Sequence, residues 1–181
     1  MTISEYILKM KGSTKSPPGV GIGELAWSWF GSVLGIALCG YLSSRYFEPR
    51  DLTLIIGSFG ASAVLLYGAI KSPLAQPRNV VGGHMLSALV GVACFQLFGS
   101  TIWIASALAV SIAIVAMLAT KTLHPPGGAT ALIAVIGGVK VHSLGYSYIL
   151  VPVGAGAVIL LVVALLVNNL SSNRKYPEYW W

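Results

Sequence analysis

The fold is decided by Thr122-Leu123-His124-Pro125-Pro126-Gly127-Gly128-Ala129-Thr130-Ala131-Leu132, where a polar, proline-stiffened turn opens directly into an apolar helix. A residue before a proline is pushed out of the α region, so we expect His124 and Pro125 to be extended. Pro126 then fits the first helical turn, where its missing N–H costs nothing. The free N–H groups that follow carry the positive end of the helix dipole, and glycine lets a small ion approach them. This pattern is typical of an anion-binding helix start.

The composition indicates a membrane protein. The 181 residues are 56% hydrophobic and 9% charged, with a mean hydropathy of +0.81, whereas soluble domains carry about 25% charged residues. The net charge of +6 comes from cations spread singly along loops, so we expect no nucleic acid partner. Cys39 and Cys94 lie in apolar runs and are interpreted as packing residues. We expect an all-α, polytopic transmembrane helix bundle.

Three further stretches accompany the His-Pro-Pro turn, namely Gly57-Ser58-Phe59-Gly60-Ala61-Ser62-Ala63, Ser72-Pro73-Leu74-Ala75-Gln76-Pro77-Arg78-Asn79 and Gly82-Gly83-His84. Together they resemble the HPP family of small integral membrane proteins, over about residues 27–167. Plant plastid and cyanobacterial members are associated with nitrite transport, so the resemblance implies nitrite as a substrate. Other members carry extra soluble domains, and we expect none in this chain.

Apolar runs predict about six membrane elements. We expect a basic N-terminal tail at 1–23, a membrane domain at 24–168 and a C-terminal tail at 169–181 with interfacial aromatic residues. The expected elements are 24–44, 52–70, 80–99, 101–120, 127–139 and 148–167. The fifth has only 13 residues, about 20 Å as a helix, which predicts a broken or partial helix. Small residues spaced four apart predict close packing on the third (Gly83, Ser87, Gly91) and fourth (Ala105, Ala109, Ala113) elements.

An internal match suggests duplication. Gly60-Ala61-Ser62-Ala63-Val64-Leu65 and Gly128-Ala129-Thr130-Ala131-Leu132-Ile133 lie 68 residues apart. The match predicts two inverted three-helix halves, 24–99 and 101–168, although Gly- and Ala-rich membrane sequences also produce such matches by chance.

Loop charges predict the orientation. Six spans with the N-terminus inside place eight Lys and Arg inside and three outside, whereas two re-entrant elements place five inside and six outside. We therefore expect six spans with both termini cytoplasmic, in a bacterial plasma membrane.

Seven residues are candidates for substrate binding: His124, Gly127, Gly128, Thr130, Ser62, His84 and Lys121. His124 either lines a path or bonds a carbonyl of its own turn, and His84 either lines a pore or bonds between helices. Lys121 either shares a helical face with His124 or extends to the membrane interface. The hydroxyls of Ser62 and Thr130 either face a ligand or bond back to the preceding turn. His142 lies in an expected loop.

Two functions remain open. The first is a transporter or channel for a small inorganic anion held at the His-Pro-Pro helix start; the residues support an anion, and only the resemblance supplies nitrite. No carboxylate lies between Asp51 and Glu178, which leaves histidine as the group for proton coupling, with passive flux equally open. The alternative is a membrane-embedded binding or assembly module. We expect no enzyme, metal or cofactor, because no metal-ligand spacing occurs, and we expect the lipid bilayer and a homo-oligomer as partners.

Overall fold

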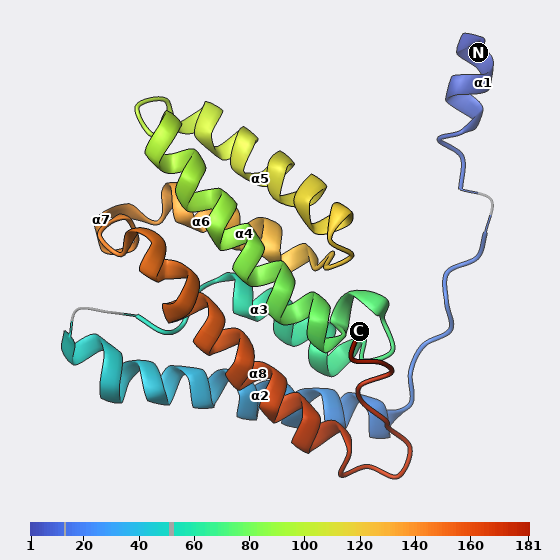
Figure 1. The fold of residues 1–181 in the computed structure, drawn as a ribbon. Helices are drawn as coiled ribbons and strands as arrows, with labels where there is room; N and C mark the ends of the chain where they lie inside the picture. The colour runs from blue at the N-terminus through green and yellow to red at the C-terminus, as the bar shows by residue number, and fades with distance from the viewer. Residues whose placement is uncertain (13, 51–52) are drawn as a thin grey trace.

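A computed structural model describes residues 1–12, 14–50 and 53–181 (Figure 1). Asp51 and Leu52, which bound a predicted break and a predicted apolar run, lie outside the described residues. The described elements are all helical. In chain order they are α1 (Ile3–Leu8), α2 (Ile22–Leu42), η1 (Ser43–Phe47), η2 (Glu48–Arg50), α3 (Ser58–Ala63), η3 (Val64–Gly68), η4 (Pro73–Ala75), α4 (Pro77–Phe98), α5 (Ile102–Ala119), α6 (Pro125–Ile136), α7 (Gly138–His142), η5 (Gly145–Ile149), η6 (Leu150–Gly154) and α8 (Ala155–Asn168).

Within the described residues, four helical segments are long and apolar enough to cross a membrane. They are Ile22–Phe47, Pro77–Phe98, Ile102–Ala119 and Gly145–Asn168. Two apolar helices are shorter, Ser58–Gly68 and Pro125–Ile136. At 1.5 Å per residue these two reach only about 16–18 Å, roughly half of a hydrocarbon core. The expected all-α bundle of about six membrane elements is confirmed, and the fifth element is short as predicted. The second element, predicted at 52–70, is shorter than expected, because its described helical part is Ser58–Gly68.

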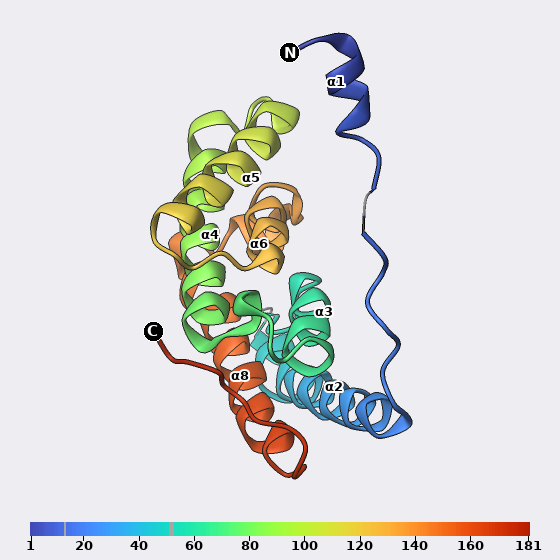
Figure 2. The ribbon, with the colours of Figure 1, turned by 90° about the vertical axis from the view of Figure 1, so that its right-hand side faces the viewer.

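The short helices α3 and α6 run between the two ends of the bundle and alternate in direction with the long helices before and after them (Figure 1); Figure 2 shows α3 and α6 beside α4. One end holds the starts of α2 and α4, and Arg174, just after α8, bonds Glu24 there. At the opposite end the ring of His142 stacks on Phe95, near the end of α4. The eight-to-three charge count assumes this alternation; the side of the membrane on which each end lies stays a prediction.

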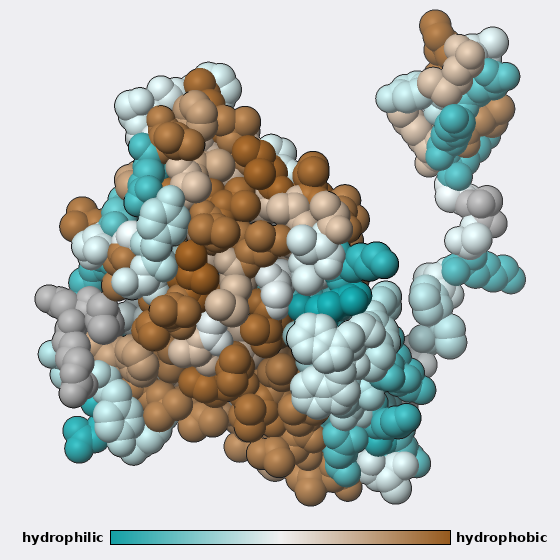
Figure 3. Space-filling view, viewed as in Figure 1, coloured by the Kyte–Doolittle hydropathy of each residue, from teal (hydrophilic) through white to brown (hydrophobic). Residues whose placement is uncertain are grey.

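The surface of the bundle is largely apolar. Figure 3 shows hydrophobic residues across the face of the bundle and hydrophilic residues gathered near its edges. Large side chains such as Trp103 (74% exposed) and Val115 (65%) point outward from α5. Such a contiguous apolar surface suits lipid rather than water.

The predicted small-residue faces form close helix contacts. A Cβ added to Gly83 would lie 2.6 Å from His124 Cβ, and one added to Gly91 would lie 2.5 Å from the Ala131 carbonyl oxygen. The face of Ala105, Ala109 and Ala113 on α5 is fully buried. Small side chains therefore bring the backbones of α4 and α6 together.

Four predicted boundaries are wrong. The helix after His124 begins at Pro125 rather than Pro126, so both prolines lie in its first turn. It ends at Ile136 rather than continuing to 139, because Gly138 has a φ of 76°, in the left-handed region. The expected loop at 140–147 is partly helical, and regular α8 begins only at Ala155, because the chain before it kinks at Val151.

We predict opposite effects of two Gly→Ala substitutions. Gly91→Ala should lower the free energy of unfolding by about 1–3 kcal/mol, because the new methyl meets backbone atoms. Gly60→Ala, where nothing lies within 4 Å of an added Cβ, should leave it unchanged or raise it by roughly 0.5–1 kcal/mol. Unfolding of purified protein in detergent, followed by tryptophan fluorescence, measures both; equal effects would contradict the close α4–α6 contact.

Candidate functional site

Five polar side chains meet inside the bundle: Ser58 and Ser62 of α3, His84 of α4, His124 at the start of α6, and Thr130 of α6. We call them the Ser62 cluster. Each is at most 1% exposed. A polar group held away from water in a membrane bundle needs a partner inside the protein, and the cluster supplies these partners from its own members.

Ser62 joins the two histidines. Its Oγ lies 2.7 Å from His84 Nε2 and 2.9 Å from His124 Nε2. The other ring nitrogen of His84, Nδ1, lies 2.7 Å from Thr130 Oγ1. Thr130 Oγ1 in turn lies 2.9 Å from Ser58 Oγ and 3.2 Å from the Pro126 carbonyl oxygen. The result is one continuous chain of hydrogen bonds across three helices.

Helix geometry explains how the cluster forms. Ser58 and Ser62 are four residues apart, so they share one face of α3. The helices α3 and α6 contact one another. They run antiparallel: Ser58, at the start of α3, meets Thr130, whereas Ser62 meets His124 at the start of α6. The absence of a side chain at Gly83 lets α4 approach closely enough for His84 to lie between them.

Neighbouring groups fix the cluster in place. His124 Nδ1 lies 2.7 Å from the Leu74 carbonyl oxygen, in the loop before α4. Asn79 Nδ2 donates to the Leu123 carbonyl at 2.9 Å, which positions the segment just before His124. The Phe59 ring packs edge-on against His84 at 5.6 Å between ring centroids. The two histidine rings lie 4.9 Å apart.

The C-terminal tail covers the loop that carries Leu74. Tyr176 is buried and donates its hydroxyl to the Ala75 carbonyl at 2.7 Å. Burial is the main cause that raises the pKa of Tyr176, so the hydroxyl keeps its proton. The backbone N–H of Glu178 donates to Gln76 Oε1 at 2.9 Å. Of the aromatic residues predicted at the interface, Tyr176 is therefore a core residue, while Trp180 and Trp181 are exposed.

Arg174 anchors this tail. Its guanidinium bonds Glu24 Oε2 at 2.6 Å, Ser28 Oγ at 2.8 Å and Asn168 Oδ1 at 2.9 Å, and also donates to the Tyr67 carbonyl. A planar guanidinium with several donors can join α2, η3 and α8 in this way.

The structure brings four of the seven predicted site residues together and leaves three outside. Ser62, His84, His124 and Thr130 belong to the Ser62 cluster. Gly127 lies in the α4–α6 contact, where an added Cβ would come within 2.7 Å of Ser87 Oγ. Its N–H donates to the His124 carbonyl at 2.8 Å.

Gly128 and Lys121 lie apart from the cluster. Gly128 faces an apolar groove of about 530 Å³ between α5 and α6. Lys121 is exposed with a φ of 57°, in the turn after α5 has ended at Ala119, so it shares no helical face with His124.

The structure also decides between several predicted contacts. His124 bonds the Leu74 carbonyl and not a carbonyl of its own turn. His84 bonds between helices, to Ser62 and Thr130. Thr130 both joins the cluster and lies within bonding distance of the preceding turn. His142 lies in α7, with Nε2 2.9 Å from the Val135 carbonyl oxygen.

Sequence analysis missed three groups that form or support the Ser62 cluster. Ser58 could have been predicted, because it lies one helical turn before Ser62. The Leu74 carbonyl could not, because the residue type does not show which backbone carbonyl accepts a hydrogen bond. Arg174 was assigned to a tail, because its partner Glu24 lies 150 residues away in sequence.

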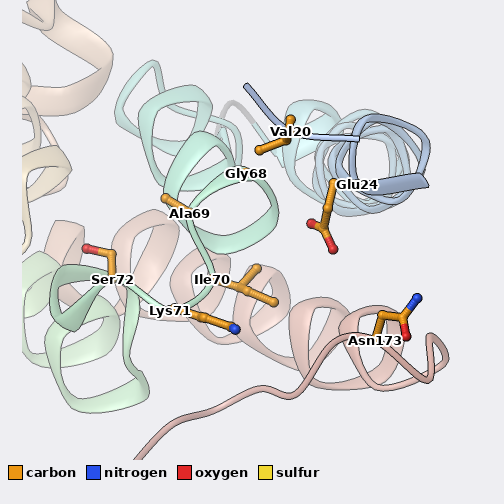
Figure 4. A pocket seen from close by; sticks show the side chains of 8 residues that line it. All are labelled: Val20, Glu24, Gly68, Ala69, Ile70, Lys71, Ser72 and Asn173. Carbon is orange, nitrogen blue, oxygen red and sulfur yellow. The ribbon is translucent and has the colours of Figure 1, made fainter. Parts of the chain in front are cut away.

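A surface pocket lies at the end of the bundle near the tail. It measures about 490 Å³ and is lined by residues of the α2 start, the 68–72 segment and the tail, including Glu24, Lys71, Ser72 and Asn173 (Figure 4). Ser72, which lines this pocket, caps the short turn that carries the Leu74 carbonyl. Within the described residues, no three His, Cys, Asp or Glu side chains are grouped to hold a metal.

Long apolar helices, an apolar outer surface and one buried cluster of histidines and hydroxyls together define a polytopic helical membrane protein. Residues 17–177 match the family described as HPP, transmembrane region, and the chain belongs to that family. It is 48% identical over 181 residues to a transmembrane protein of Dictyostelium discoideum, DDB_G0273707/DDB_G0273361, covering 98% of this chain and 58% of that protein. A second Dictyostelium discoideum transmembrane protein, DDB_G0269096, is 44% identical over 186 residues, covering 100% of this chain and 65% of that protein.

The chain spans about three fifths of the length of these curated relatives. No solved structure matches it.

We predict that Arg174→Ala lowers the free energy of unfolding by about 2–4 kcal/mol, because buried acceptors lose their donor. The neighbouring, exposed Lys175→Ala should change it by less than about 0.5 kcal/mol. Thermal unfolding in detergent measures both. Equal stability of the two variants would show that the tail does not anchor the bundle.

Proposed function

We propose that this chain is a transporter or channel for a small inorganic anion, and that the Ser62 cluster is where the anion passes. The observation that carries the proposal is the position of Ser62, whose single hydroxyl contacts both histidines in the interior of the bundle. Ionisable side chains inside a membrane protein are costly, and their usual role is in substrate or ion pathways.

The donors of the cluster suit an anion. Imidazole N–H and hydroxyl groups can donate to an anion that has lost part of its water, without the tight hold of a permanent cation. No carboxylate occurs in the chain between Asp51 and Glu178, so no fixed negative charge from this span repels the anion.

In this proposal the side chains of the Ser62 cluster, more than the backbone N–H groups of α6, contact the anion. The first two residues of α6 are prolines without N–H groups, and the Gly127 N–H already bonds the His124 carbonyl. The positive end of the α6 dipole still points toward His124, which adds a favourable field for negative charge. The backbone of Gly127 therefore contributes through the dipole, and His84, His124, Ser62 and Thr130 supply the contacts.

Nitrite is the substrate implied by the resemblance to HPP proteins. We also propose that both termini lie in the cytoplasm, because this orientation places eight of the basic residues inside. The bacterial plasma membrane stays a prediction; the relatives named above come from Dictyostelium discoideum.

The packing disfavours the alternative of an assembly module. That hypothesis relied on small-residue faces for oligomerisation, but Gly83, Gly91 and the alanines of α5 are used within the bundle. A homo-oligomer remains part of the proposal, and its contacts would come from the exposed apolar side chains of the bundle surface.

We predict that Ser62→Ala reduces nitrite uptake into liposomes at least tenfold, because the variant loses the hydroxyl shared by His84 and His124. Ser111→Ala is the matched control, since Ser111 is exposed on α5 and bonds only its own helix, at the Leu108 carbonyl. Uptake by the control should equal that of the unmodified protein.

The experiment uses purified full chain, with empty liposomes as the baseline and nitrate and formate as competitors. Folding of each variant is checked by size-exclusion chromatography and thermal unfolding. Uptake no greater than in empty liposomes, with inserted and folded protein, would refute transport. Undiminished uptake by Ser62→Ala would move the path away from the cluster.

A further inference from the structure

We infer that the Ser62 cluster binds one exchangeable proton on His84, and that the anion crosses together with this proton. The inference rests on the proposed function for the identity of the transported ion. It rests on hydrogen-bond geometry alone for the proton site. The two parts are therefore tested separately.

The Leu74 carbonyl fixes the proton positions at one end. A carbonyl oxygen only accepts, so His124 Nδ1, 2.7 Å away, must carry a hydrogen. A neutral His124 then has a bare Nε2, which accepts the Ser62 hydroxyl proton at 2.9 Å. The Ser62 oxygen has only lone pairs left, so His84 must donate to it from Nε2 at 2.7 Å.

The other end of the chain of hydrogen bonds follows from this assignment. A neutral His84 that donates from Nε2 has a bare Nδ1, which accepts the Thr130 hydroxyl proton at 2.7 Å. Every donor therefore points in one direction, from Thr130 through His84, Ser62 and His124 to Leu74. In this state every ring nitrogen of the two histidines has a partner.

A second proton state fits the same heavy-atom positions. If His84 Nδ1 takes up a proton, it becomes a donor to Thr130 Oγ1. The Thr130 hydroxyl must then turn away, and the Pro126 carbonyl oxygen lies 3.2 Å from it, with Ser58 Oγ at 2.9 Å. Rotation of one hydroxyl is enough to accommodate the extra proton, so Thr130 serves both states.

A hydronium ion at the aqueous end of the bundle gives its proton to the Nδ1 lone pair of neutral His84 and becomes water. His84 becomes an imidazolium with one positive charge, and no other bond forms or breaks. Return of the proton to water on the opposite side restores the neutral cluster.

The membrane setting couples this proton to the anion. An imidazolium without a counter-charge is costly in a low-dielectric interior, and so is an isolated anion. Binding of either one therefore favours binding of the other, and the pair is electrically neutral.

The surroundings of His84 contain no competing charge among the described residues. From α3, Phe59 and Ser62 contact His84, and from the start of α6 the ring of His124 lies next to it. Tyr148 of η5 donates its hydroxyl to the Thr130 carbonyl at 3.3 Å. The sequences of α5, α8, η4 and η6 contain no titratable side chain. His124 is the one imidazole next to His84. A proton on His124 Nε2 would require the Ser62 hydroxyl to turn away and His84 to change its tautomer, whereas a proton on His84 Nδ1 requires only the Thr130 hydroxyl to turn.

The first test determines which ring nitrogens of His84 and His124 carry protons, and it does not depend on transport. Nitrogen NMR of histidine-labelled protein, with His142→Gln to remove the third imidazole, should show His124 protonated on Nδ1 and His84 on Nε2 at high pH. Acidification should place a second proton on His84 first. A His124 protonated on Nε2, or one that takes up the second proton before His84, would overturn the inference whatever the transport result.

The second test follows protons and nitrite together in liposomes that contain a pH-sensitive dye. We expect one proton per nitrite. Thr130→Val removes the hydroxyl that accepts from the cationic His84, and charge-assisted hydrogen bonds are the stronger kind, so the midpoint of the pH dependence should shift to lower pH by about one unit. Thr130→Ser keeps the hydroxyl and should retain the original midpoint.

The outcomes separate the two proposals. Nitrite uptake without proton movement would overturn the coupling and leave anion transport standing. Absence of nitrite uptake would overturn the proposed function, while the NMR result would still decide the proton site. An unshifted midpoint in folded Thr130→Val would contradict the part assigned to Thr130.

Discussion

The bundle depends on one shared hydroxyl. Ser62 Oγ satisfies the Nε2 atoms of His84 and His124 at the same time, and these residues come from three separate elements of the chain. In a membrane interior a polar atom that loses its partner has no water to replace it, so the three elements must keep their relative positions. The short helix α3 has only six residues. Its position is set by hydrogen bonds of Ser58 and Ser62 as well as by packing.

Close backbone approach makes these hydrogen bonds possible. Without a hydrophobic driving force between helices in lipid, small residues and short contacts hold a bundle together. Gly83 lets α4 come against the segment before α6, and Gly127 lets α6 come against Ser87. At the end of the bundle, Arg174 anchors the C-terminal tail, and Tyr176 of that tail bonds the segment whose Leu74 carbonyl orients His124. Packing, tail and polar cluster thus form one connected arrangement.

Part of this arrangement could be predicted from the sequence. Apolar runs and four-residue spacing of small residues are local patterns, so the membrane elements and the buried faces of α4 and α5 were recoverable. The internal match also pointed at the right hydroxyls, since Ser62 and Thr130, 68 residues apart, contact opposite nitrogens of His84. Contacts between residues far apart in the sequence could not be predicted. Nothing local to Arg174 indicates Glu24, and nothing in residue type reveals a carbonyl acceptor such as that of Leu74.

The absence of a carboxylate from the cluster favours the reversible protonation of His84 that we propose. A carboxylate beside His84 would favour its cationic form permanently and would hold a proton without any anion. A hydroxyl does not, because it donates to a neutral imidazole and accepts from a charged one with similar geometry. Thr130 has acceptors available in both cases, the Pro126 carbonyl among them. In the proposed mechanism the charge of the cluster is therefore set by the proton and the anion that occupy it, and the anion leaves as readily as it binds.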